Sequence, residues 1–72
     1  MKNRSGKEIQ RGRLALRIKQ THFAAFCDVE PEHMSRIENG KVNVPGYVNT
    51  ILTLLERDQT AILFLMEGKG LL

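Results

Sequence analysis

Apolar residues recur every three or four positions along most of the chain, which is the spacing of one face of an α-helix. The alternation of apolar and polar residues that is typical of a strand is weak throughout. Because 72 residues suffice for one domain only, the pattern predicts a single all-α domain. The expected helices run over about residues 7–17, 21–27, 31–38, 45–56 and 59–67.

Residues that begin or end helices stand at several of these boundaries. Ser5 and Glu8 have the spacing of a capping box, in which each side chain accepts a hydrogen bond from the backbone amide of the other residue. Asp28 tolerates a left-handed backbone and is expected to close the second helix. Pro31 suits the first position of the third helix, where a missing N–H costs nothing. Gly12 lies inside the first helix and is expected to weaken it by about 1 kcal/mol relative to alanine.

The net charge of +3 is unevenly distributed. Residues 1–20 hold seven basic side chains and one acidic side chain, a net +6, whereas the other 52 residues hold four basic and seven acidic ones, a net −3. A basic segment on a near-neutral body suits contact with phosphates on one side of the molecule. A solvated helix face with a charged tail explains the charge equally well.

Several classes of protein are not supported by the composition. The single Cys27 cannot form an internal disulfide, and no Cys or His residues cluster at metal-ligand spacing, so we expect neither a metal nor a cofactor. No paired carboxylates, nucleophile with a base, or phosphate-binding glycine loop indicates an enzyme. The longest apolar run, residues 61–66, is too short for a membrane span, and no signal peptide is evident. A lone cysteine without an export signal favours the cytoplasm.

Two short helices joined by a tight turn form the pattern of a helix-turn-helix between about residues 20 and 39. Gln20 opens the second helix, Ala24 stands where two helices cross, Val29 lies in the turn, and the third helix ends in the run from Ser35 to Lys41, SRIENGK. With these features the chain resembles the phage repressor and Cro family, also called the XRE family, over about residues 7–67. The resemblance implies a compact five-helix, lambda-repressor-like domain that binds double-stranded DNA. We therefore divide the chain into a flexible basic arm (residues 1–6), a helix-turn-helix domain with a C-terminal dimerisation helix (residues 7–68) and a tail (residues 69–72).

The resemblance also implies which residues contact DNA. Gln20 matches a position that bonds a phosphate, and Arg36 matches a base-facing position whose guanidinium fork fits guanine, worth about 1–3 kcal/mol of discrimination. The family usually has a small hydroxyl residue at the position of Glu30 and often neutral polar residues in place of Pro31 and Glu32, so direct reading is expected to rest mainly on Arg36. The full set of expected DNA contacts is Gln20, Thr21, Pro31, Glu32, His33, Ser35, Arg36, Asn39 and Lys41.

Two further expectations concern the core of the domain. Arg13 matches a first-helix arginine that pairs with a glutamate at the position of Glu38, and this ion pair is expected to be structural. Cys27 falls where the family has a core aliphatic residue, so its thiol is expected to be buried and structural.

The fifth helix is apolar on nearly every side between Ile62 and Met66. Because a body of four helices covers one side only, residues Ile62, Leu63, Phe64, Leu65 and Met66 are expected to meet a second copy. The resulting homodimer would read an inverted-repeat operator as a transcriptional regulator, most simply a repressor of a phage or mobile-element operon. The alternative is an antitoxin or other interaction module whose apolar helix binds a different protein. A third interpretation, a helical bundle without a nucleic-acid role, predicts no salt-dependent retention on DNA.

Overall fold

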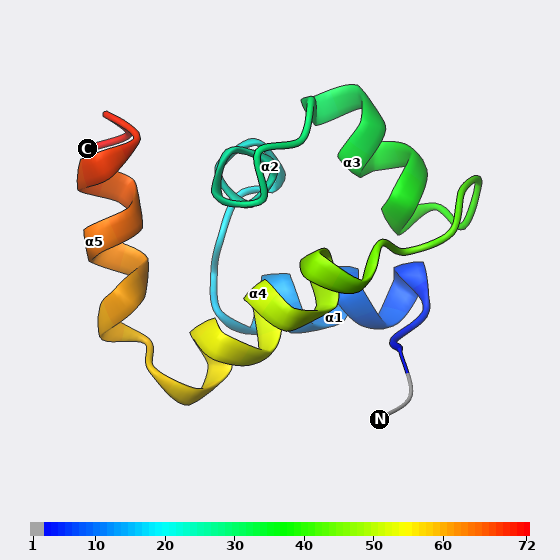
Figure 1. Cartoon of the computed structure of the whole chain (residues 1–72), viewed down its shortest axis with the longest axis horizontal. Coiled ribbons are helices and arrows are strands. Elements are labelled where there is room, and N and C mark those ends of the chain that lie inside the picture. Colours follow the sequence, from blue (N-terminus) through cyan, green and yellow to red (C-terminus); the bar gives the residue numbers. More distant parts are fainter. Residues whose placement is uncertain (1–2) are drawn as a thin grey trace.

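The computed structural model describes residues 3–72, and these residues form five α-helices and no strand. This arrangement, which can be followed in Figure 1, confirms the prediction of an all-α domain with five helices. The helices are α1 (Gly6–Ala15), α2 (Gln20–Phe26), α3 (Pro31–Glu38), α4 (Gly46–Arg57) and α5 (Thr60–Gly68).

The predicted helix boundaries are correct to within one or two residues. The capping box at the start of α1 is confirmed, because the Glu8 amide donates to Ser5 Oγ at 3.2 Å and the Ser5 amide donates to Glu8 Oε1 at 2.8 Å. Helix α1 ends two residues earlier than expected because Arg17 adopts a left-handed backbone, with φ at 59°. Asp28 closes α2 as predicted, with φ at 56°.

Helices α4 and α5 each begin one residue later than expected. Pro45 is the N-cap of α4 rather than its first residue, and Gln59 is the N-cap of α5. The Asp58 side chain, one residue before this N-cap, accepts no hydrogen bond from a backbone amide of α5. Its Oδ1 atom accepts a hydrogen bond of 2.5 Å from the Thr60 hydroxyl instead.

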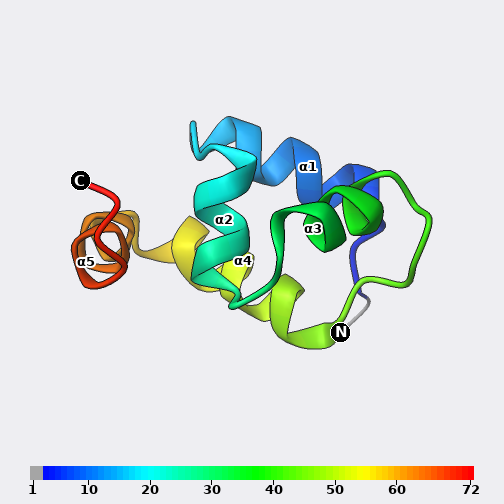
Figure 2. The same cartoon turned by 90° about the horizontal axis from the view of Figure 1, so that it is seen from above.

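Helices α1 to α4 enclose one apolar core, and α5 lies against its outer side. Helix α3 packs on α1 and α2, α4 packs on α1, and α5 packs on α2 and α4. Figures 1 and 2 show α5 at one end of the molecule and α3 toward the other, with α2 between them. The buried apolar side chains of the core are Ile9, Ile18, Phe23, Ala24, Phe26, Cys27, Met34, Ile37, Val48, Leu52 and Leu55.

Two glycines allow α1 to approach its neighbours closely. A Cβ atom on Gly6 would lie 2.0 Å from the backbone oxygen of Ile37, at the C-terminal end of α3. A Cβ atom on Gly12 would lie 2.8 Å from Cδ2 of Leu52, which is fully buried in α4. The glycine that weakens α1 as an isolated helix therefore permits the contact between α1 and α4.

The segment before α1 is fastened to the rest of the domain. The Arg4 guanidinium forms an ion pair with Glu56 of α4, and Asn3 Nδ2 donates to the backbone oxygen of Val44 at 3.4 Å. Within the segment that was expected to form a flexible arm (residues 1–6), Asn3 and Arg4 thus contact a loop and a helix that lie far along the chain. Gly6 already belongs to α1, and residues 1 and 2 lie outside the described part of the chain. No helix in residues 3–72 is long and apolar enough to cross a membrane.

Candidate nucleic-acid interface

Helices α2 and α3 are joined by a short turn that hydrogen bonds fix in place. The Asp28 amide donates to the Ala25 oxygen at 3.1 Å, and the Val29 amide donates to the Ala24 oxygen at 2.9 Å. The left-handed backbone at Asp28 reverses the chain direction, and Val29 packs against the core as its apolar character predicts. Two helices of seven and eight residues with this connection form a helix-turn-helix.

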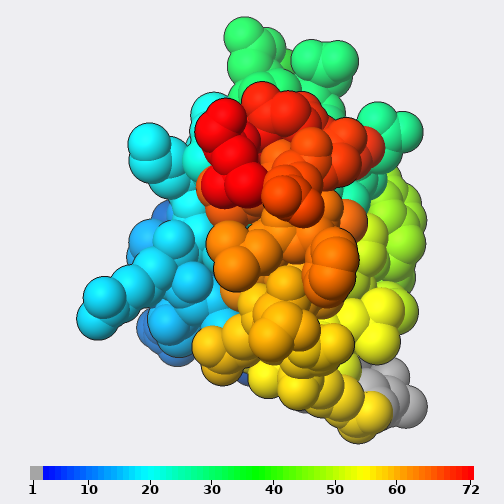
Figure 3. Space-filling model, turned by 90° about the vertical axis from the view of Figure 1, so that its left-hand side faces the viewer, coloured from blue at the N-terminus to red at the C-terminus, as the bar shows by residue number. Residues whose placement is uncertain are grey.

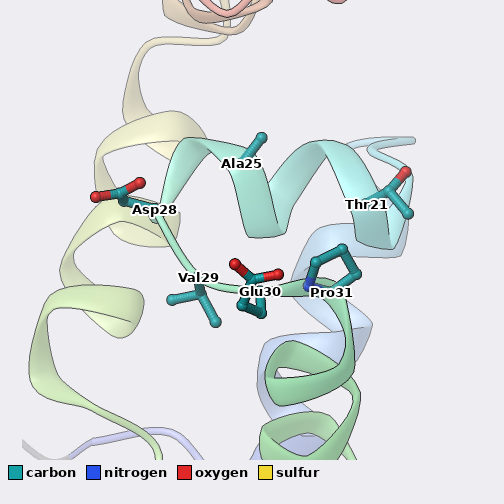
Figure 4. Close-up of a pocket in the computed structure, with 6 residues that line it drawn as sticks. All are labelled: Thr21, Ala25, Asp28, Val29, Glu30 and Pro31. Atoms are coloured by element: carbon teal, nitrogen blue, oxygen red, sulfur yellow. The ribbon is translucent and has the colours of Figure 1, made fainter.

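The starts of α2 and α3 share one surface. A cavity of about 220 Å³ lies between them, and it is lined by Thr21 and Ala25 of α2, by the turn, and by Pro31 of α3. Figure 4 shows Glu30 beside Pro31 and beneath α2 in this cavity. Thr21 and Pro31, both predicted DNA contacts, thus lie on the same side of the molecule although they are ten residues apart in the sequence.

Three of the five predicted contact residues of α3 lie on its solvent side. Pro31, Glu32 and Arg36 are exposed, whereas Met34 and Ile37 on the opposite face are completely buried. The outer face of α3 is therefore uncovered and accessible to a partner as large as double-stranded DNA. His33 and Ser35 are half-buried beside that face, and Asn39 and Lys41 are exposed just after it.

The C-terminal end of α3 is held by its own side chains. Asn39 Nδ2 donates to the Ser35 backbone oxygen at 2.9 Å and approaches the Ser35 hydroxyl at 3.3 Å. The Lys41 amide donates to the Arg36 oxygen at 2.9 Å, which places the exposed Lys41 side chain next to the last turn of α3. Gly40 has φ at 75°, so the chain leaves the helix through a backbone conformation that suits glycine.

A buried carboxylate ties the three N-terminal helices together. Arg13 of α1 donates from Nε to Glu38 Oε2 at 2.8 Å and from Nη2 to Oε1 at 2.9 Å, while its Nη1 donates to the Ile18 oxygen at 2.8 Å. Arg13 is 6% exposed and Glu38 is fully buried, so each charge depends on the other for compensation. The expected structural ion pair therefore forms.

Gln20 joins this network, which the sequence did not reveal. Its Nε2 atom donates to Glu38 Oε1 at 3.0 Å, so the amide nitrogen of the predicted phosphate contact already has a partner inside the protein. The neighbouring Lys19, the N-cap of α2, and Arg17 are both exposed. Neither of these two basic residues is among the DNA contacts predicted from the sequence. Lys19 directly precedes Gln20, and this position is the sequence signal that points to it.

The charge around the helix-turn-helix is mixed. Arg36 and Lys41 bring positive charge to the C-terminal half of α3 and the residue that follows it, whereas the exposed residues Asp28, Glu30 and Glu32 bring negative charge to the turn and the start of α3. Negative charge at this end suits the positive end of the helix dipole. It also disfavours close approach of phosphates to the N-terminal end of α3.

The lone cysteine has no feature of a reactive site. Cys27 is 4% exposed, and burial raises the pKa of its thiol from 9.0 to about 12. The thiol is therefore neutral and weakly nucleophilic at physiological pH, which agrees with a structural role. Among residues 3–72, no group of three or more His, Cys, Asp or Glu side chains has the arrangement of a metal site.

Helix α5 presents two different faces. Ile62, Leu65 and Met66 pack against the core, whereas Leu63 is 62% and Phe64 is 74% exposed. In Figure 3, which views the molecule from the side of α5, this helix crosses the middle of the surface. Of the five residues expected at a dimer interface, only Leu63 and Phe64 are freely available, and the exposed side chains Leu54 and Leu72 extend the apolar surface.

Comparison with known proteins found no matching family model, no matching curated protein and no matching solved structure. The function is therefore inferred from the residues of the chain and their arrangement.

Proposed function

We propose that this protein is a sequence-specific, double-stranded DNA-binding transcription regulator that acts as a homodimer. The observation that carries the proposal is the α2–turn–α3 unit, in which the outer face of α3 is exposed while its inner face is anchored in the core. In a helix-turn-helix this second helix enters the major groove and the first helix crosses the DNA backbone.

The exposed residues of α3 divide into base readers and backbone contacts. Arg36 is the main base reader, because its planar fork matches the O6 and N7 acceptors of guanine. Glu32 accepts a hydrogen bond from the N4 amino group of cytosine, and Pro31 offers an apolar contact to the methyl group of thymine. Lys41 after α3 and Lys19 before α2 are exposed cations suited to phosphates.

Gln20 has a structural role in this proposal beside the phosphate contact that the family resemblance implies. Because its amide nitrogen is bonded to Glu38, Gln20 orients the start of α2 relative to the end of α3. The side-chain amide of Gln20 has two N–H donors, and the one that is not bonded to Glu38 is proposed to donate to a phosphate. Lys19, directly before it, offers an exposed cation to the same stretch of DNA backbone.

The dimer and its regulatory role complete the proposal. Two copies related by a twofold axis place two α3 helices about one turn of DNA apart, which calls for an inverted-repeat operator. A small DNA-binding domain of this kind regulates most simply by repression, and an autoregulated phage or mobile-element operon in the cytoplasm is the setting we propose. The exposed apolar residues Leu63 and Phe64 also suit an antitoxin-like interaction with a different protein, which is the second candidate function.

The experiment that tests the proposal is selection of binding sites from a random double-stranded DNA library, followed by fluorescence anisotropy on the selected site. Arg36→Ala is expected to weaken binding by about 5-fold to 150-fold, the equivalent of about 1–3 kcal/mol, and to relax preference at one guanine. Arg11→Ala is the matched control, because it removes the same charge from an exposed position on α1.

The selection and the variant have separate outcomes. Recovery of an inverted repeat by the wild-type protein supports the proposal, and unchanged affinity in Arg11→Ala shows that loss of charge alone is not responsible. If Arg36→Ala kept both the affinity and the sequence preference of the wild type, α3 would not read bases through this side chain. Failure to select any DNA would overturn the DNA-binding function itself.

A further inference from the structure

Four helix ends within residues 3–72, those of α1, α2, α3 and α5, share one backbone arrangement. In each, the amide two residues after the C-cap donates to the carbonyl oxygen five residues earlier, and the residue between the C-cap and that amide has a left-handed backbone. This is the Schellman motif. Its four left-handed residues are Arg17 (φ 59°), Asp28 (φ 56°), Gly40 (φ 75°) and Gly70 (φ 69°).

Arg17 is the least expected of these four residues. Glycine suits the left-handed backbone because it has no Cβ atom, and aspartate adopts it more readily than most residues because its short side chain bonds locally. Arginine has neither property. The attraction between a cation and the negative end of a helix dipole is available throughout the last turn, so it does not call for a basic residue at this position. The local structure of α1 therefore does not explain Arg17.

The Arg17 side chain is free, whereas its backbone is fixed. The side chain is exposed and forms no ion pair within residues 3–72. The Arg17 amide donates to the Leu14 oxygen at 2.9 Å. The carbonyl oxygen of the next residue, Ile18, accepts a hydrogen bond of 2.8 Å from Nη1 of the buried Arg13. Because Arg13 is also bonded to Glu38 at the end of α3, the turn that carries Arg17 is held in place relative to α3.

This turn leads directly into the end of α2 that is proposed to lie on the DNA backbone. Lys19 is the N-cap of α2 and Gln20 is its first residue, and both are proposed phosphate contacts. The first helix of a helix-turn-helix crosses the phosphate backbone, so a cation just before its start is suited to bind a phosphate. A guanidinium does so through charge-assisted and often paired N–H bonds.

We propose that Arg17 binds a DNA phosphate beside the one that Gln20 contacts, and that this contact explains an arginine where the backbone favours glycine. The inference rests on the proposed function and adds a binding residue that the family resemblance does not assign. A fixed backbone beneath a free cation suits this role, because the position of the charge is then set before DNA arrives.

Arg17→Gly tests the proposal, because the fold and the contact are expected to respond in opposite directions. Glycine relieves the left-handed backbone, so the variant is expected to unfold at a temperature no lower than the wild type, measured by circular dichroism. Its affinity for the DNA site selected by the wild-type protein is expected to fall. In fluorescence anisotropy, the slope of log K against log salt concentration is expected to become shallower by about 0.9 for each Arg17 removed. For each contact, the loss is then about 3.5-fold larger at 50 mM salt than at 200 mM.

A phosphate contact has a second signature, which is indifference to sequence. Arg17→Gly is expected to weaken binding to the selected site and to a scrambled duplex by the same factor. Arg36→Ala, in contrast, is expected to relax the preference between the two DNAs.

Two matched variants separate the charge of Arg17 from the conformation of the turn. Asp28→Gly makes the same backbone change at the end of α2 and removes a negative charge, so it is expected to bind DNA at least as tightly as the wild type, with a slope no shallower. Arg17→Lys keeps the positive charge at the end of α1 and is expected to keep the slope of the wild type.

The outcomes that would overturn the proposal differ from those that concern the proposed function. If the wild type bound its selected site and Arg17→Gly bound it with the same slope, Arg17 would not contact a phosphate, and the proposed function would stand. A loss of thermal stability in Arg17→Gly would show that the arginine serves the fold instead. A shallower slope in Asp28→Gly as well would attribute the effect to the backbone change, and a loss confined to the selected site would indicate a base contact. A wild-type chain that binds no DNA would overturn the proposed function and this contact with it.

Discussion

At the scale of single residues, the buried Glu38 carboxylate connects α3 to two other helices. It accepts hydrogen bonds from Arg13 and Gln20, which belong to two other helices, and it is fully buried. A buried ion pair contributes little net stability compared with a well-packed apolar pair, but loss of one partner leaves an uncompensated charge inside the protein. Its role is therefore to fix how α1, α2 and α3 meet.

The first prediction at this scale concerns removal of the carboxylate. Glu38→Ala is expected to lower the free energy of unfolding by about 3–5 kcal/mol, because the Arg13 guanidinium stays buried without its counter-charge. Urea denaturation followed by circular dichroism measures the change. Glu32→Ala on the exposed face of the same helix is the control and should stay within about 0.5 kcal/mol of the wild type.

A double variant separates charge compensation from packing. Arg13→Met combined with Glu38→Leu removes both charges and is expected to recover a large part of the lost stability. If the double variant were as unstable as Glu38→Ala alone, the packing of the two side chains rather than their charges would explain the effect.

At the scale of elements, the contacts of α1 determine how the helix-turn-helix is supported. Gly6 brings the start of α1 against the Ile37 backbone oxygen, and Gly12 brings its middle against Leu52. The helix pattern alone makes Gly12 appear unfavourable, since glycine is a poor helix former, and it places Gly6 before the helix. The close approach of α3 and α4 to α1 gives both glycines a structural reason.

The prediction for these elements compares two glycines that each occupy the first position of a helix. Gly6→Ala is expected to destabilise the domain by at least about 2 kcal/mol, because its Cβ would collide with backbone that cannot move aside. Gly46→Ala at the start of α4 meets open space and is expected to stabilise by about 0.4–1 kcal/mol through the unfolded state. Thermal unfolding of both variants checks the order, and equal effects would contradict the close contact between α1 and α3.

At the scale of the whole molecule, the face proposed to read DNA and the exposed apolar face belong to different helices. The exposed side of α3 belongs to the proposed DNA interface, whereas Leu63 and Phe64 of α5 are the exposed residues of the expected homodimer interface. Helix α2 lies between these two elements and packs on both of them. A pair of copies joined through α5 would thus leave the residues that are proposed to read DNA uncovered.

The prediction for the whole molecule follows from this separation. The double variant Leu63→Glu with Phe64→Glu is expected to be monomeric and to lose most of its affinity for a full inverted repeat, because linked half-sites no longer gain from effective concentration. Its affinity for an isolated half-site should stay near that of the wild type. Light scattering and anisotropy measure the two properties, and a dimeric double variant with full operator affinity would show that α5 does not form the interface.

Much of the fold and part of the candidate site could be predicted because their signals are local. Helical periodicity, the capping box at Ser5 and Glu8, and the left-handed turn at Asp28 depend on residues within one or two turns of the chain. The Arg13–Glu38 pair was predicted from the family resemblance. Local patterns could not predict it, because the two residues belong to different helices and lie 25 residues apart in the sequence. The contacts of Gln20 with Glu38 and of Arg4 with Glu56 were not predicted, because these partners lie 18 and 52 residues away in the sequence.

The helix-turn-helix pattern was thus determined by the sequence alone, because turn chemistry and apolar spacing act over short stretches of chain. Which exposed residues remain available was decided by the tertiary structure. The sequence showed that the segment from Ile62 to Met66 is apolar all round, but packing of α5 on α2 and α4 divides it into a covered face and the exposed pair Leu63 and Phe64. The physical reason is that burial depends on how elements cross, and the crossing is set jointly by every side chain between them.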